Sequence, residues 1–194
     1  MNFYEQENNK TVLKTREIVR ELPEFCNEFF LDLNQNTLPK TRMGYAYDLR
    51  VFFNFLVTEN KEFLGRDIKS LTLDDLQKIK VVDINQFMDY LAYYVSDEDS
   101  QLYSNGENGK ARKLAAVRKL FKYFYRTEKI SSNPAELTIT PKKHEKEIVR
   151  LEPNEVAEML DVIENGSKMT SKQKEYYEKT KTRDLAIVTL LLGT

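Results

Sequence analysis

Residues 110–126, KARKLAAVRKLFKYFYR, are the stretch of sequence that decides the fold class. The large apolar side chains recur three, four and three positions apart, at Leu114, Val117, Phe121 and Phe124. This spacing places them on one face of an α-helix, and lysine and arginine occupy the flanks and the opposite side. The stretch therefore predicts a helix with one buried apolar face and one basic side.

Helical spacing continues on both sides of this stretch. Helices are expected over 12–21, 23–35 and 39–57, after a cap at Asp83, from Pro153 onward and over 183–192. The 194 residues include only 6 Gly and 5 Pro, which is few for a protein made of strands and tight turns. Every element before residue 138 looks helical, and the polar stretch 96–109 is expected to be a connection. The sequence predicts a mainly α protein.

The net charge of −1 conceals an uneven distribution. Residues 110–150 contain 12 Lys and Arg against 4 acids, whereas residues 1–109 contain 12 against 19 and residues 151–194 contain 6 against 8. Salt screens charges beyond about 8–10 Å, so an approaching phosphate responds to the local block and not to the total. The sequence therefore predicts one strongly basic region in an otherwise acidic chain.

The sequence contains no recognisable complete catalytic site. His144 is the only histidine, and its lysine-rich surroundings favour a solvated side chain over a Ser-His-Asp or Cys-His arrangement. Cys26 is the only cysteine, which excludes a disulfide within the chain, and its aromatic neighbours favour a buried apolar residue. HExxH, GxSxG and glycine-rich phosphate motifs are absent. No stretch approaches the roughly 18 apolar residues of a membrane span, so no membrane association is expected.

Two interpretations of the basic helix stay open. A helix anchored by an apolar stripe can turn its basic side to the phosphates of duplex DNA, but basic helix faces are more often simply solvated. Pro39–Arg42 is a second candidate surface, because Thr41 and exposed backbone N–H groups at a helix start can bind phosphate. Tyrosines 45, 47, 123 and 125 are interpreted as core residues and not as a stacking platform.

Five short segments follow one another in a specific order. They are residues 41–56 (Thr41, Tyr45, Asp48-Leu49, Phe52, Phe55-Leu56), residues 112–123 (RKLAAVRKLFKY), residues 133–143 (NPA, then PKK), residues 151–156 (Leu151, Glu155-Val156) and residues 183–194 (RDLAIVTLLLGT). From about residue 24 to the last residue, the chain resembles tyrosine site-specific recombinases of the Xer and phage-integrase kind. The resembling parts are the core-binding domain, the interdomain linker and the beginning of the catalytic domain.

This resemblance implies a domain organisation. Residues 1–137 would form a helical, SAM-like core-binding domain of four to five helices, residues 138–150 the linker, and residues 151–194 the truncated, mostly helical start of the catalytic domain. Together the two lobes would clamp double-stranded DNA. The residues expected to contact DNA are Thr41, Arg42, Lys110, Arg112, Lys113, Arg118, Lys122, Lys142 and Lys143.

The resemblance also implies a chemistry. In such proteins a tyrosine attacks a DNA phosphate to form a 3′-phosphotyrosyl link, and neither a metal ion nor a nucleotide cofactor is needed. The first catalytic arginine would follow Thr194, so no catalytic residue is assigned. The full-length protein would act in the bacterial cytoplasm at the nucleoid, as a tetramer of protomers on inverted-repeat half-sites. The alternatives are a non-catalytic helical DNA-binding regulator and a protein-interaction module whose basic helix binds an acidic partner.

Overall fold

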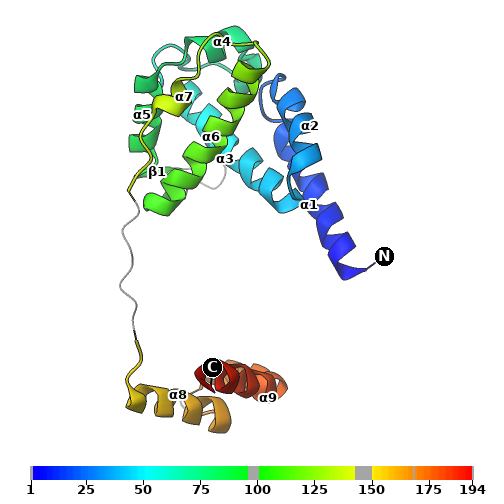
Figure 1. Cartoon of the computed structure of the whole chain (residues 1–194), viewed down its shortest axis with the longest axis vertical. Helices are drawn as coiled ribbons and strands as arrows, with labels where there is room; N and C mark the ends of the chain where they lie inside the picture. Colours follow the sequence, from blue (N-terminus) through cyan, green and yellow to red (C-terminus); the bar gives the residue numbers. More distant parts are fainter. Residues whose placement is uncertain (1, 96–100, 143–149, 168, 194) are drawn as a thin grey trace. The chain divides into compact units, whose positions relative to one another are not determined.

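The computed structural model describes residues 2–95, 101–142, 150–167 and 169–193, and α-helices dominate it (Figure 1). In chain order the elements are α1 (Phe3–Val19), α2 (Cys26–Asn36), α3 (Pro39–Glu59), the 3₁₀ turn η1 (Ile68–Ser70), α4 (Leu73–Lys78), α5 (Val81–Tyr90), β1 (Tyr94–Val95), β2 (Leu102–Tyr103), α6 (Glu107–Arg126), α7 (Pro134–Leu137), α8 (Pro153–Asn165) and α9 (Ser171–Gly193). The predicted mainly α fold class is confirmed. Contacts divide the chain into two compact units, Met1–His144 and Glu145–Thr194.

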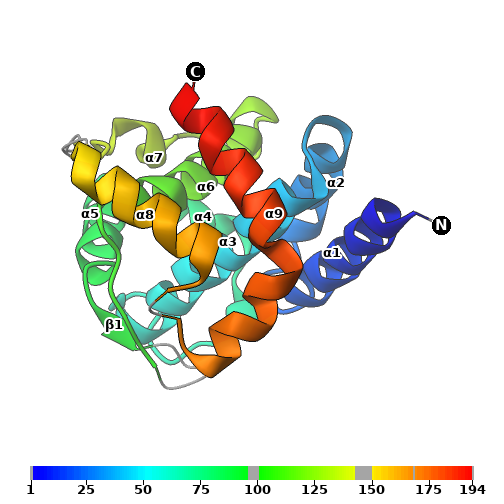
Figure 2. The ribbon, with the colours of Figure 1, turned by 90° about the horizontal axis from the view of Figure 1, so that it is seen from below.

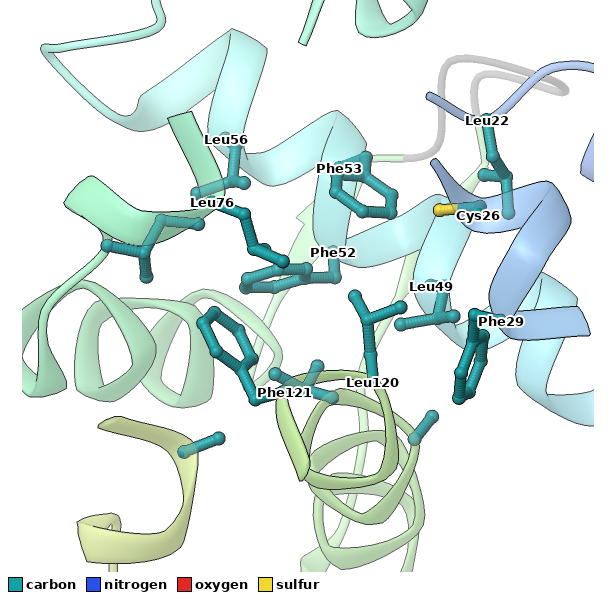
Figure 3. Close-up of a cluster of buried hydrophobic side chains, with 14 of the residues drawn as sticks. Leu22, Cys26, Phe29, Leu49, Phe52, Phe53, Leu56, Leu76, Leu120 and Phe121 are labelled. Atoms are coloured by element: carbon teal, nitrogen blue, oxygen red, sulfur yellow. The ribbon is translucent and has the colours of Figure 1, made fainter. Parts of the chain in front are cut away.

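Helices α3 and α6 form the centre of the first unit. Both α1 and α2 pack against α3 on one side, and α5 and α7 lie on the other side (Figure 1). Figure 3 shows the core between them, where α2, α3, α4 and α6 contribute buried side chains that include Cys26, Phe29, Leu49, Phe52, Phe53, Leu56, Leu76, Leu120 and Phe121. The buried face predicted for residues 110–126 is confirmed, because Leu114, Val117, Phe121 and Phe124 are all fully buried. Cys26 is buried, as predicted.

Several local expectations differ from the structure. Residues 94–95 pair with 102–103 in a two-stranded antiparallel hairpin, where only helices and a connection were expected. Asp83 was expected to precede and cap a helix, but that helix already begins at Val81. Asp83 lies inside its first turn and accepts a hydrogen bond from the backbone N–H of Lys80 (2.7 Å). Tyr123 is buried as expected, whereas Tyr125 is 51% exposed. The helix expected over 183–192 already begins at Ser171.

The second unit consists of α8 and α9, which pack against each other (Figure 2). Glu155 accepts the backbone N–H of Glu152 (2.8 Å) at the start of α8. The helix ends at Asn165 and is followed by Gly166, whose φ of 66° favours glycine; a side-chain carbon at Gly166 would lie 2.9 Å from the ring of Tyr177. In the described part of this unit neither helix has a buried residue, and Leu190, Leu191 and Leu192 are exposed.

Within the described ranges, no helix combines the length and the apolar character that crossing a membrane requires.

Candidate nucleic-acid interface

The exposed face of α6 is a stripe of basic and small residues. Five of its exposed positions follow each other at intervals of four, three, four and three residues, which is the spacing of one helix face: Asn108, Arg112, Ala115, Lys119 and Lys122. We call these five residues the basic stripe. The sole acidic residue of α6 is Glu107, in its first turn. The stripe therefore contains three cations, and α6 contributes no acidic side chain to it.

Acidic residues of α2 limit the stripe at the C-terminal end of α6. Asp32 lies 3.1 Å from the guanidinium of Arg126, and Glu28 pairs with Lys129 just beyond the helix. Glu28 also accepts a hydrogen bond from the Tyr123 hydroxyl (2.7 Å), and these contacts lower the pKa of the Glu28 carboxyl. The last turn of α6 is thus bound to α2, and the part of the basic stripe that α2 does not neutralise extends from Arg112 to Lys122.

Arg112 joins the stripe to α3. One terminal nitrogen, Nη2, lies 2.7 Å from Oδ1 of Asp48, a residue of α3 that is only 1% exposed. The other, Nη1, lies beside Gly44, where an added side-chain carbon would be 3.6 Å away. Burial raises the pKa of Asp48 to about 6, and the charges of Arg112 and Lys113 oppose this rise. The guanidinium therefore covers a buried carboxylate while more than half of the Arg112 side chain stays exposed.

Lys113 points into the protein. Only 7% of the residue is exposed, and its Nζ donates to Oδ1 of Asn105 (2.7 Å). Asn105 in turn donates through Nδ2 to the carbonyl of Leu91 (3.1 Å). Desolvation lowers the pKa of Lys113, and the nearby Asp48 carboxylate raises it. The side chain thus ties α6 to the segment after β2 and does not belong to the stripe.

Arg118 attaches α6 to the segment that follows it. The guanidinium donates to the carbonyl of Ala135 (3.0 Å), to the hydroxyl of Thr140 (2.6 Å) and to the carbonyl of Thr138. Thr138 itself is buried. The chain therefore stays packed on the first unit through residues 138–140, and Lys142 follows as an exposed cation. Lys143 and His144 lie outside the described residues.

The start of α3 is the second predicted surface. Pro39 begins the helix, and Lys40 and Thr41 are exposed in its first turn. Arg42 is half-buried, and its Nη1 donates to the carbonyl of Thr37, so it holds the turn between α2 and α3. Thr41, Gly44 and Asp48 are three and four residues apart and share the face of α3 that Arg112 contacts. Arg112 therefore lies against the same face of α3 as Thr41, at Gly44 and Asp48.

The residues predicted to contact DNA thus have different environments. Arg112, Lys122 and Lys142 are exposed cations, Thr41 is exposed and Lys110 is half-buried. Arg42, Lys113 and Arg118 form hydrogen bonds within the first unit. The predicted set omitted Lys119, although its spacing from Arg112 and Lys122 was visible in the sequence. It also omitted Asp48, because only packing shows which cation a buried acid contacts.

Comparison with known proteins shows what this chain is similar to. The tyrosine recombinase XerC of Caldanaerobacter subterraneus subsp. tengcongensis is 32% identical over 179 residues, which cover 89% of this chain and 44% of the relative. This chain is a relative of the tyrosine recombinases. XerC of Chlorobaculum parvum is 30% identical, and the match covers 84% of this chain and 46% of the relative. XerS of Streptococcus uberis is 28% identical, and the match covers 86% of this chain and 53% of the relative.

The resemblance stated from the sequence motifs is confirmed by these relatives. The chain spans about half the length of the curated relatives that it matches. No protein-family model matches it, and no solved structure does.

Proposed function

We propose that this chain is the DNA-binding part of a tyrosine recombinase and that it grips double-stranded DNA with the basic stripe of α6. The observation that carries the proposal is the stripe itself, because three cations share one exposed helix face that has no acid. Ala115 lies in the middle of the stripe, and such a small side chain permits close approach of a phosphate backbone. The exposed residues Lys40 and Thr41 of α3 and Lys142 after α7 extend the same interface.

In this proposal the whole recombinase cuts and rejoins DNA through a 3′-phosphotyrosyl intermediate, and the present chain contributes binding. The bacterial relatives named as tyrosine recombinases support this role. Other protomers would occupy neighbouring inverted-repeat half-sites, and the protein would work in the cytoplasm at the nucleoid. By itself, the 194-residue chain would bind a duplex without cleaving it. Residues 1–137, 138–150 and 151–194 would serve as core-binding domain, linker and start of the catalytic domain.

Titration against duplex DNA at several salt concentrations tests the proposal. Neutralised phosphates release condensed counterions, so contacts by Lys40, Arg112, Lys119, Lys122 and Lys142 predict a log–log slope of about −4 to −5. Fluorescence anisotropy with a labelled duplex measures this slope. A slope near zero would contradict DNA binding and favour an interaction module for an acidic protein.

A paired substitution locates the interface. Lys119→Gln with Lys122→Gln removes two exposed cations that form no hydrogen bond or ion pair with any residue that the structure describes, and we expect the slope to become shallower by about 2. The matched control is Lys61→Gln with Lys69→Gln, which removes two exposed lysines between α3 and α4. Equal losses in both pairs would show a general charge effect and contradict a stripe-specific interface.

A further inference from the structure

We propose that Asp48 is a positioning residue, whose buried carboxylate holds the Arg112 guanidinium in the orientation in which it binds a DNA phosphate. The inference rests on the proposed DNA-binding function and deepens it. It concerns the seam where α3 and α6 meet, at the N-terminal end of the basic stripe.

The burial of Asp48 requires an explanation that packing does not provide. The residue is 1% exposed and lies on a helix face with Leu49 and Phe52, and neither of its carboxylate oxygens accepts a hydrogen bond within the described residues. A buried carboxylate without such bonds costs free energy, and a neutral side chain of similar shape avoids that cost. A contribution to folding therefore does not account for an acid at this position.

The geometry of Arg112 supplies the explanation. Its Nη2 lies 2.7 Å from Oδ1 of Asp48, and its Nη1 lies over Gly44. One edge of the planar guanidinium is thereby anchored, while 56% of the side chain is exposed. An anchored arginine loses less rotamer freedom when a phosphate binds its remaining N–H groups, and a planar guanidinium can contact two anions at once. The carboxylate thus orients the arginine for the phosphate.

Other groups around the carboxylate do not take this role. The charge of Lys113 favours the ionised form of Asp48, but the Nζ of Lys113 donates its hydrogen bond to Asn105. Arg50 forms an ion pair with Glu21 (2.9 Å) and lies over the ring of Tyr47. The remaining titratable side chains that line the same pocket are the tyrosines 90, 94 and 103, which stack on one another. Arg112 is the cation that combines contact with Asp48 and wide exposure.

Positioning and plain electrostatics predict opposite effects of removing this acid. The loss of a carboxylate beside a basic surface strengthens DNA binding if charge alone matters. If Asp48 positions Arg112, Asp48→Asn weakens binding of the 194-residue chain to a duplex by roughly fivefold to tenfold, which is within the net range of one ordinary hydrogen bond. The matched control is Asp89→Asn, an exposed acid of α5, which should bind DNA as tightly as the unsubstituted chain or slightly tighter.

Two readouts separate positioning from a general structural effect. In an Arg112→Ala background, Asp48→Asn should cause no further loss, because the two residues act through one contact. In addition, the affinities of the unsubstituted chain and Asp48→Asn should converge as the pH falls below about 6, where Asp48 becomes protonated. An altered fold would leave the two affinities separated at every pH.

The outcomes distinguish this inference from the proposed function. If the unsubstituted chain does not bind the duplex, the proposed function fails and this inference with it. If it binds and Asp48→Asn binds equally well or better, only the positioning role is overturned. Should Asp48→Asn lose its helical circular dichroism, Arg112→Lys decides the matter, because it keeps the charge without the two-edged guanidinium. Full affinity in Arg112→Lys overturns the inference, and a loss of several-fold supports it.

Discussion

The guanidinium of Arg118 donates a 2.6 Å hydrogen bond to the hydroxyl of Thr140 and so joins the middle of α6 to the segment after α7. Two further bonds reach the carbonyls of Ala135 and Thr138. From the sequence, Arg118 was expected to contact DNA. In the structure, its guanidinium instead forms hydrogen bonds within the first unit. By holding residues 135–140 against α6, it also fixes the segment that precedes the exposed Lys142.

Arg118→Ala is therefore expected to destabilise the first unit. The substitution leaves two backbone carbonyls without their charged donor, and we expect the free energy of unfolding to fall by about 1–3 kcal/mol. Chemical denaturation followed by circular dichroism measures this change. Lys119→Ala, at the neighbouring exposed position of the same helix, serves as the control and should shift the value by less than about 0.5 kcal/mol. Equal stability of Arg118→Ala and the unsubstituted chain would contradict the bracing role.

Asp48 makes the stability of the protein depend on pH. Burial raises its pKa from 3.8 to about 6, although Arg112 and Lys113 favour the charged form. The folded state therefore binds the proton more tightly than the unfolded chain, so this contribution to stability is present at low pH and is lost as the pH rises through about 6. We expect Asp48→Asn to be more stable at pH 7.5, by about 2–3 kcal/mol.

The advantage of Asp48→Asn should shrink as the pH falls from 7.5 toward 4. Thermal unfolding of both proteins across this range measures it, and the difference between them removes the contribution of other acids. An advantage that stays constant with pH would show that Asp48 does not titrate in this range. Greater stability combined with weaker DNA binding would indicate that the carboxylate serves function at the expense of stability.

Tyr123 connects α6 to α2 by a single hydrogen bond. Its hydroxyl donates to Oε1 of Glu28 (2.7 Å), and burial together with this carboxylate raises the pKa of Tyr123 to about 12. Tyr123→Phe should lower the free energy of unfolding by about 1 kcal/mol and leave DNA affinity unchanged. The exposed Tyr125→Phe is the matched control for stability. A loss of DNA affinity in Tyr123→Phe would contradict its assignment to the core and favour a stacking role.

The sequence was sufficient for the features that depend on local periodicity. The spacing of Leu114, Val117, Phe121 and Phe124 predicted both the course of α6 and its buried face, because side chains three and four residues apart share one side of a helix. The same reasoning located α3 from Pro39. Element ends were less well predicted, since Asp83 caps from the third helical position and the hairpin of β1 and β2 is too short to show alternation.

The sequence alone determined that the chain is mainly α, that its basic residues concentrate between 110 and 150, and that its motifs resemble those of the tyrosine recombinases. Only the tertiary structure decided which cations are exposed. Arg112, Lys113 and Arg118 are equally basic in the sequence, yet one faces outward over Asp48, one points inward to Asn105 and one binds backbone carbonyls. The physical reason is that helical periodicity fixes only the direction of a side chain, whereas its partners come from other segments of the chain.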